Sequence, residues 1–354
     1  MKNHFFVALA RKQAYSITKK MGATDEDIIE ALNPTSVAFY IVPLINAMVR
    51  VGTMEEKRRM FEAFVNGDKL IPSQKRGAKG TLEKVAVESA RECANAKRHQ
   101  DDAKEEIAKN LEKRILEQGL LDNKILFVKL TDADKFLQPL TGLVCMQLSA
   151  KYNRPTILAR YNKKEDTYSG SARGLDKSEV SSFKEFLNST ELFNYTMGHD
   201  NAFGCSINND LIDEFFNRSN EILKDVNFGE KIYEPMFVRY PNDSDLERII
   251  YDLSNKEVFW GQKCQLPLIL VENIFLEKKD IQIMGKNKDT IKFTKNGISY
   301  LKFFAKDLIA QLDNFDGKIC ATVIGEAGIN EWMGKTNPQI SIKDIELKEA
   351  KFEF

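Results

Sequence analysis

The sequence has few cysteines, and their arrangement excludes two common classes of small protein. The five cysteines are odd in number and widely spaced, and no two of them form a C-x-x-C pair. This spacing argues against a disulfide framework and against a zinc ribbon. We therefore expect all of them to be reduced: Cys93, Cys145, Cys205, Cys264 and Cys320.

Long apolar segments are also missing. The longest apolar stretches, such as the one from Leu266 to Val271 that Pro267 interrupts, are far shorter than the roughly 20 residues that span a bilayer. The N-terminal MKNHFF leads directly into a helical pattern with Lys and Arg spread along it, without the apolar core and cleavage site of a signal peptide. The sequence therefore predicts a cytoplasmic protein without a membrane span.

A net charge is missing too. Lys and Arg together number 52, as do Asp and Glu, so no overall field attracts a polyanion. The 354 residues, 43% hydrophobic and 29% charged, are typical of a folded chain with two or three packed units. Binding to nucleic acid therefore has to rely on local clusters of cations.

Helical patterns dominate the first part of the chain. Apolar spacing predicts helices over residues 4–20 and 24–32. The run SVAFYIV at 36–42 favours a short strand, and PLINAMVRVGT at 43–53 leads into a helix that stops at Gly67. These residues predict a small helical region.

One long helix is predicted next. Gly77 and Gly80 mark a linker, and neither glycine nor proline occurs from residue 81 to residue 118. Apolar residues recur there every four positions, which predicts a helix of roughly 57 Å. Such a helix is suited to joining two domains, although a helix packed along the surface of one domain has the same pattern.

Strand and helix patterns alternate after this helix and predict an α/β domain with a partly parallel sheet. From Lys231 onward the pattern changes to short strands separated by turn residues, which favour a small barrel or sandwich. The predicted α/β strands are 124–130, 155–161 and 166–174, with helices at 140–152, 178–188 and 211–226; later helices are predicted at 244–253 and 305–312.

A phosphate-binding pattern ends one of these strands, at Gly170, Ser171, Ala172 and Arg173. Glycine lets backbone N–H groups approach an anion, a serine hydroxyl donates a hydrogen bond, and a guanidinium binds phosphate through two hydrogen bonds. By itself the pattern is weak, because a strand followed by Gly-Ser and a surface arginine is common.

Gly198 and His199 form a second candidate, in the segment MGHDNAFG. A histidine among small residues offers a donor close to the backbone, although a satisfied loop histidine fits the pattern equally well. The other two histidines, His4 and His99, lie in predicted helices where we expect them to be solvated.

Two further segments have residues suited to an anion. Thr141 and Gly142 open a predicted helix, where free N–H groups and the helix dipole favour negative charge, as at any ordinary start of a β–α unit. Asn46 and Arg50 lie four residues apart and share one face if residues 43–53 are helical.

In this order the four segments resemble the C-terminal two thirds of the RecJ-like single-strand-specific exonucleases, which belong to the DHH phosphoesterase superfamily. In that family the catalytic DHH domain ends in a segment like residues 43–53, and a long helix crosses to a DHH-associated domain. That domain has a Gly-Ser-x-Arg strand end and a Gly-His loop, like Gly170–Arg173 and Gly198–Gly204 here. Met197 replaces the usual glycine before the Gly-His pair.

The resemblance continues to the C-terminus. Residues 259–269 look like the family's Phe-Gly-x-Gly-Asn-x-x-Pro turn through Gly261 and Pro267, and residues 324–347 look like its OB-like barrel. The barrel match is carried by Asn330, Glu331, Trp332, Gly334, Gln339 and Asp344.

The resemblance implies an α/β fold class with four parts. Residues 1–78 would be the end of a DHH domain and residues 79–120 a long connecting helix. Residues 121–228 would form an α/β DHH-associated domain, and residues 229–354 a β-rich OB-like domain.

The resemblance also implies a role: the nucleic-acid-binding part of a 5′-to-3′ single-stranded DNA exonuclease. Ser171, Arg173 and His199 would hold the terminal phosphate, with Asn46 and Arg50 closing the pocket. Trp332, Tyr300 and Phe303 would stack on bases, unless they belong to the core. The nucleic-acid-binding residues implied are Asn46, Arg50, Thr141, Gly142, Gly170, Ser171, Arg173, Gly198, His199 and Trp332.

The family's metal ligands are not found. DHH enzymes hydrolyse phosphoesters with two divalent ions, Mn²⁺ or Mg²⁺, held by Asp and His, yet this sequence has no Asp-His-His. His99 with Asp101 and Asp102 is the one acidic grouping with a histidine that we single out, and it fits a solvated helix face. We expect no metal site in the chain and no cleavage by the chain alone.

Three explanations remain open. The chain is the strand-binding part of an exonuclease whose catalytic half lies elsewhere, or a non-catalytic accessory subunit that pairs with a separate DHH-domain protein. A nucleotide phosphodiesterase for small substrates is the third, and the predicted barrel argues against it because a small substrate needs no long binding path.

Overall fold

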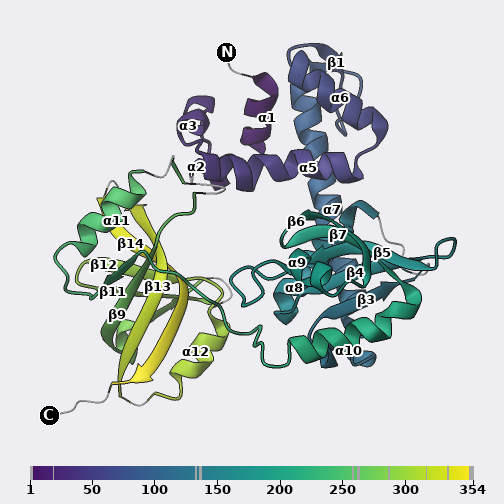
Figure 1. The fold of residues 1–354 in the computed structure, drawn as a ribbon. Helices are drawn as coiled ribbons and strands as arrows, with labels where there is room; N and C mark the ends of the chain where they lie inside the picture. Colours follow the sequence, from purple (N-terminus) through teal and green to yellow (C-terminus); the bar gives the residue numbers. More distant parts are fainter. Residues whose placement is uncertain are drawn as a thin grey trace. The chain divides into compact units, whose positions relative to one another are not determined.

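The chain divides into two compact units, Met1–Ile232 and Tyr233–Phe354 (Figure 1). Both are described from a computed structural model. It describes residues 3–18, 20–131, 134, 138–256, 259–260, 264–285, 288–315, 317–332 and 335–350.

Unit 1 begins with short helices around an apolar core that includes Phe5, Leu9 and Met48. Side-chain caps fix where these helices start: Asn3 caps the first, and Thr24 and Thr53 each form a capping box. The elements are α1 His4–Lys12, α2 Ala14–Thr18, α3 Asp25–Glu30, α4 Pro34–Ser36, the π-helical η1 Val37–Ile41, α5 Val42–Val51 and α6 Met54–Val65.

The strand predicted at 36–42 is wrong, because these residues are helical from α4 through η1 to α5. Asn33 and Ser36 form a capping box with Pro34 in the first turn, so the helix starts before the β-branched run. Burial of Ile41 in the core then outweighs the strand propensity of its neighbours.

The continuous helix Pro34–Val51 also differs from the expectation that no segment is suited to a membrane. It is long and apolar enough, by length and composition alone, to cross one. Leu44, Ala47 and Met48 on this helix are buried, however, in the way that a helix of a folded domain buries one side.

The predicted linker is a hairpin. The strands β1 (Leu70–Pro72) and β2 (Leu82–Lys84) pair antiparallel, and Gly77 and Gly80 lie in the connection with φ of +82° and +87°. Only glycine adopts such φ values without strain, which explains both glycines.

Helix α7 (Val85–Glu117) follows and links two cores. Its 33 residues make a rod of about 50 Å, shorter than predicted because Leu82–Lys84 form a strand. Val85, Ala90 and Cys93 belong to the helical core, whereas Ala108, Leu111 and Ile115 pack with the sheet that follows. The helix therefore joins the two halves of unit 1 (Figure 1).

The second half of unit 1 is a five-stranded sheet in the order β3-β4-β5-β7-β6. Strands β3 and β4 are parallel and joined through α8, and the other pairs are antiparallel. The elements are β3 Leu126–Leu130, α8 Thr141–Tyr152, β4 Thr156–Asn162, β5 Thr167–Arg173, α9 Phe183–Ser189, β6 Phe193–His199, β7 Ala202–Asn208 and α10 Ile212–Ile222.

The Gly-His loop expected from the resemblance is instead a β-hairpin, since β6 and β7 are joined by Asp200 and Asn201 alone.

The two faces of the sheet are covered by different helices. Val144 and Cys145 of α8 pack on one face, while Phe183 of α9 and Phe215 of α10 pack on the other.

Unit 2 is a seven-stranded sheet in the order β10-β11-β12-β14-β13-β9-β8, with α11 and α12 toward opposite ends (Figure 1). Tyr300 is fully buried and stacks on Phe293, so of the two alternatives left open for it, base stacking or core, the core is correct. The elements are β8 Phe237–Arg239, α11 Leu246–Ser254, β9 Leu268–Glu277, β10 Gln282–Met284, β11 Thr290–Lys295, β12 Ile298–Lys302, α12 Lys306–Leu312, β13 Lys318–Trp332 and β14 Lys335–Glu349.

Candidate phosphate and nucleic-acid interface

The strand register places Arg173 and His199 in one row. Arg173 on β5 pairs with Ala202 on β7, and Ala202 pairs with His199 on β6. Residues paired across neighbouring strands point to the same face, and two strand spacings separate β5 from β6 by roughly 10 Å. The next row on this face is Ser171, Gly204 and Met197.

The start of α8 joins this row. A Cβ atom on Gly142 would collide with the guanidinium of Arg173 and would lie 3.8 Å from the hydroxyl oxygen of Ser171. Glycine at this position therefore makes room for Arg173. No side chain caps the N-terminus of this helix, so the positive end of its dipole lies beside the two side chains without a capping partner.

Gly170 and Gly198 shape the backbone. A Cβ on Gly170 would overlap the carbonyl oxygen of Leu158 on β4, so glycine allows the two strands to approach. Gly198 has a φ of +140°, and a Cβ there would lie 2.8 Å from the carbonyl oxygen of Ala202. These two glycines set the geometry of the strands that carry Arg173 and His199.

The tip of the β6–β7 hairpin is held in place by α9. The side-chain oxygen of Asn201 accepts a hydrogen bond from the Phe183 N–H at 3.1 Å, and its amide donates to the Ser181 carbonyl at 3.1 Å. Lys184 donates to the carbonyl of Gly198 at 3.1 Å. These bonds fix the backbone on either side of His199, and the sequence alone did not point to Asn201.

The positive charge of Arg173 is not neutralised by a carboxylate among the described residues. Its guanidinium donates a hydrogen bond of 2.7 Å to the carbonyl oxygen of Ala172. No ion pair of Arg173 is found among the described residues. Arg114, by contrast, is paired with Asp134. Arg173 therefore has donors that are available for an anion.

Cys145 lies beneath this surface and is structural. Its thiol contacts the carbonyl oxygens of Thr156 at 3.1 Å and Ser171 at 3.3 Å. Burial raises the pKa of the Cys145 thiol to about 12, so the thiolate needed for nucleophilic attack is not formed near neutral pH.

Asn46 and Arg50 lie on α5, where Asn46 is exposed and Arg50 is half-buried. Helix α5 contacts the 3-10 turn Gln138–Leu140, which runs directly into Thr141. The sheet, the start of α8 and α5 therefore meet at one region of unit 1.

The remaining predicted residues belong to unit 2. Trp332 is the last residue of β13, and Phe303 is exposed just after β12. Gly261 and Gly334 lie outside the described residues.

No group of three or more His, Cys, Asp or Glu side chains suited to a metal is found among the described residues. One Asp-x-Asp triplet, Asp25–Asp27, precedes residues 43–53. Asp25 is paired with Arg11, and Asp27 accepts hydrogen bonds from Thr24. The described residues thus do not fit the two-metal centre.

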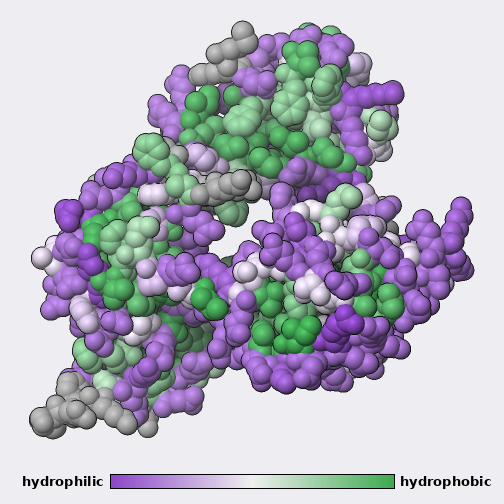
Figure 2. Space-filling model, viewed as in Figure 1, coloured by the Kyte–Doolittle hydropathy of each residue, from purple (hydrophilic) through white to green (hydrophobic). Residues whose placement is uncertain are grey.

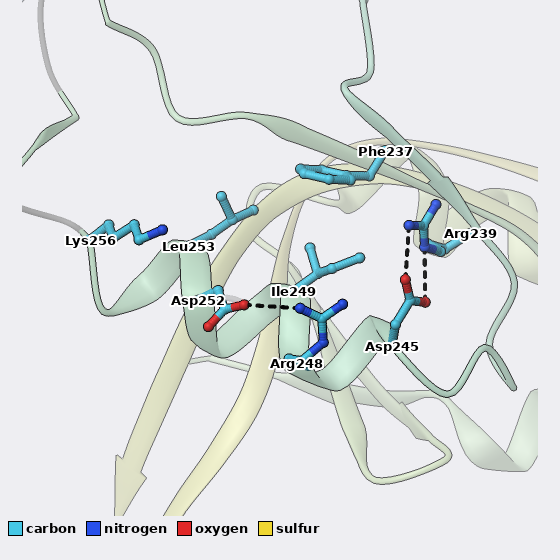
Figure 3. A pocket seen from close by; sticks show the side chains of 8 residues that line it. All are labelled: Phe237, Arg239, Asp245, Arg248, Ile249, Asp252, Leu253 and Lys256. Carbon is cyan, nitrogen blue, oxygen red and sulfur yellow. Dashed lines mark hydrogen bonds and ion pairs between the residues drawn. The ribbon is translucent and has the colours of Figure 1, made fainter.

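A separate cavity of about 270 Å³ lies in unit 2, between β8 and α11 (Figure 3). Phe237 lies on one side of it, with Ile249 and Leu253 of α11 opposite. Arg239 is held by two hydrogen bonds of 3.0 and 2.9 Å to Asp245, and this arginine lowers the pKa of the carboxyl. Because both arginines that line it are paired with carboxylates, Arg239 with Asp245 and Arg248 with Asp252, this cavity is a weaker anion site than the surface around Arg173.

Comparison with known proteins identifies relatives. Residues 243–344 match the family model of the RecJ OB domain. The chain is 36% identical over 319 residues to the putative SPbeta prophage-derived single-strand DNA-specific exonuclease YorK of Bacillus subtilis, a match that covers 88% of this chain and 55% of YorK. It is 23% identical over 349 residues to RecJ of Bacillus subtilis, a match that covers 96% of this chain and 40% of RecJ.

The fold is shared with a solved structure. RecJ from Thermus thermophilus, in complex with Mn²⁺, matches with a TM-score of 0.61 at 19% identity, over 98% of this chain and 44% of RecJ. The chain thus spans about half the length of the proteins it matches, and the predicted α/β fold class with an OB domain is confirmed. We conclude that this chain contains a RecJ OB domain and is similar, along most of its length, to part of the single-strand DNA-specific exonucleases YorK and RecJ.

Proposed function

We propose that this chain is the nucleic-acid-binding part of a RecJ-like single-stranded DNA exonuclease. The guanidinium of Arg173, the hydroxyl of Ser171 and the first N–H groups of α8 bind a phosphate of the strand. His199 contacts the same or the next phosphate from the edge of the sheet. Asn46 and Arg50 close the site from α5.

One observation carries this proposal: residues from three separate segments meet around an arginine that no described carboxylate neutralises. Gly142 makes room for Arg173, and Ser171 and His199 lie on the same sheet face. A free guanidinium beside an uncapped helix start is suited to phosphate. The names of the relatives supply the substrate class, because YorK and RecJ are called exonucleases specific for single-stranded DNA.

The catalytic metals belong, in this proposal, to polypeptide beyond the described residues. The related RecJ structures contain Mn²⁺ or Mg²⁺, and the described part of this chain does not offer a set of ligands for either. This chain then positions the strand and does not cleave it.

The first prediction concerns Arg173. In fluorescence anisotropy with a 5′-labelled oligo-dT, we expect Arg173→Ala to lower affinity about tenfold, because one charge-assisted phosphate contact is lost. The slope of log affinity against log salt should fall by about 0.7, the value for one phosphate contact to a single strand. Unchanged affinity in the Arg173→Ala, His199→Ala double variant would refute the assignment.

Arg98→Ala is the matched control, since it removes the same charge from an exposed position on α7. A 5′-phosphorylated and a 5′-hydroxyl oligonucleotide, compared in the same assay, report whether the terminal phosphate is the one bound. Release of nucleotides by this chain alone with Mn²⁺ would contradict the proposal that the metals lie elsewhere.

An accessory subunit that pairs with a separate DHH-domain protein is the second candidate. The observation in its favour is the exposed apolar surface of the helical part of unit 1, where green side chains gather in Figure 2. Exposed apolar side chains of this helical part include Phe39, Val49, Met54, Phe61 and Val65. If this candidate is right, Phe39→Ser with Phe61→Ser abolishes association with the unmatched half of YorK, measured by light scattering, and leaves oligo-dT affinity unchanged.

A further inference from the structure

The edge strand β6 carries two exposed apolar side chains, Tyr195 at 45% and Met197 at 73% relative exposure. Exposed edge strands are usually protected by charge, proline or a covering element, because unpaired edges favour aggregation. Tyrosine and methionine give no such protection, so their exposure calls for another explanation.

The register shows which way these side chains point. Tyr195 pairs with Ser206 and Met197 with Gly204, whereas the alternate residue Cys205 is buried in the core on the opposite side. Side chains two residues apart on a strand share a face. Tyr195, Met197 and His199 therefore form one stripe, which we call the β6 stripe, on the face that holds Ser171 and Arg173.

Small residues separate the β6 stripe from Ser171 and Arg173. Gly204 lies between Met197 and Ser171, and Ala202 lies between His199 and Arg173. Helix α8 packs on β4 and β5, the part of this face farther from the edge. The surface between Arg173 and the β6 stripe is therefore formed by small residues and is continuous with the site of the proposed function.

The spacing within the stripe suits a nucleobase. Residues two apart on an antiparallel strand are separated by roughly 6.8 Å along the strand. A stacked base occupies roughly 3.4 Å along its strand, so one base fits between Tyr195 and Met197. An aromatic ring and a polarisable thioether both pack on the face of any base, whatever its identity.

We propose that Tyr195 and Met197 bind the base of the nucleotide next to the phosphate held at Arg173, so that the β6 stripe is a base-binding track for single-stranded nucleic acid. This inference rests on the proposed function. It assigns the base contacts of unit 1 to the edge strand β6. It also makes Met197 a ligand-contacting residue at a position where the resemblance predicts glycine.

The experiment uses two probes of equal length and equal charge: oligo-dT and an abasic deoxyribose-phosphate oligomer. With the full chain, we expect Tyr195→Ala and Met197→Ala each to weaken oligo-dT binding about tenfold and abasic binding less than twofold, because only the base contact is removed. Tyr195→Phe should keep oligo-dT affinity within twofold of the original chain, since the ring remains.

Matched controls come from exposed residues of the same types. Tyr161 lies at the end of β4 and pairs with Tyr168, on the opposite face of the same sheet, and Met21 is exposed in the helical part. Tyr161→Ala and Met21→Ala should leave both affinities unchanged. Thermal unfolding of every variant checks that the fold is retained.

The outcomes separate this inference from the proposed function. If Arg173→Ala weakens both probes while the Tyr195 and Met197 variants weaken neither, the β6 stripe is overturned and the phosphate site stands. Equal losses on both probes for Tyr195→Ala would also overturn it, as a base contact cannot act on an abasic strand. If the original chain binds neither probe, both proposals fail.

Discussion

At the level of single residues, the candidate site depends on missing side chains as much as on present ones. Gly142 leaves space for the guanidinium of Arg173, and Gly204 and Ala202 keep the sheet face low between Arg173 and His199. A larger side chain at such a position would disturb the site without removing any group that binds the phosphate. Affinity and stability can then be tested separately with one substitution.

We expect Gly142→Ala to weaken oligo-dT binding at least fivefold and to leave the melting temperature unchanged or slightly raised. The new methyl group displaces the flexible Arg173 side chain, and alanine in a helix is favoured over glycine by about 0.5 to 1 kcal/mol. Anisotropy and thermal unfolding of the same sample measure the two effects. A loss of stability without a loss of affinity would show that Gly142 serves packing alone.

At the level of elements, the hairpin β1–β2 is fastened to α7 by a cluster of charges. Arg91 on α7 pairs with Glu83 of β2 at 2.5 Å and with the buried Glu88, which also accepts the Gln74 N–H at 3.0 Å. Hydrogen bonding to Arg91 lowers the pKa of Glu83 to about 2, whereas burial raises the pKa of Glu88. Acid therefore affects the two carboxyls differently: protonation removes a stabilising interaction of Glu83, whereas it relieves the cost of burying a charged Glu88.

Glu83 predicts a loss of stability in acid. A carboxyl whose pKa is lower in the folded state stabilises the fold above its ordinary pKa of 4.5, and this contribution disappears as the pH falls toward 2. The free energy of unfolding of the original chain should exceed that of Glu83→Gln by about 1 to 3 kcal/mol at pH 6. The difference should shrink steadily below pH 4.5 in urea titrations.

The control for this prediction is Glu105→Gln, at an exposed position on α7. It should change the free energy of unfolding by less than about 0.5 kcal/mol, both at pH 6 and below pH 4.5. A Glu83→Gln difference that does not depend on pH would mean that packing, and not the pair with Arg91, is what the substitution disturbs.

At the level of the whole molecule, each unit has its own core. The core of unit 2 includes Ile250, Val271 and Tyr300, and all of its members lie after residue 232. We therefore expect residues 233–354 to fold alone and limited proteolysis to cut near residue 232. Calorimetry of the full chain should show two transitions, one of which matches the isolated unit 2. A single transition, with an unfolded fragment, would show that the units stabilise each other.

Local sequence patterns determined most of the elements. The predicted helix at 140–152 and strands at 155–161 and 166–174 agree with α8, β4 and β5 to within a few residues, because capping residues, glycines and apolar periodicity act over short distances. The residue types at Ser171 and Arg173 likewise indicated phosphate before any contact was known. Their order along the chain carried the resemblance, and the matches to the RecJ OB domain and to YorK confirmed it.

Only the tertiary structure decided which residues share a surface. Residues 36–42 have strand-forming side chains, yet the capping box at Asn33 and the burial of Ile41 make them helical. Pairing of β6 with β7, and of β7 with β5, puts His199 in the same row as Arg173 and turns Met197 toward that row. Such pairing joins residues far apart in the sequence, and its energy depends on the assembled core, so no local pattern encodes it.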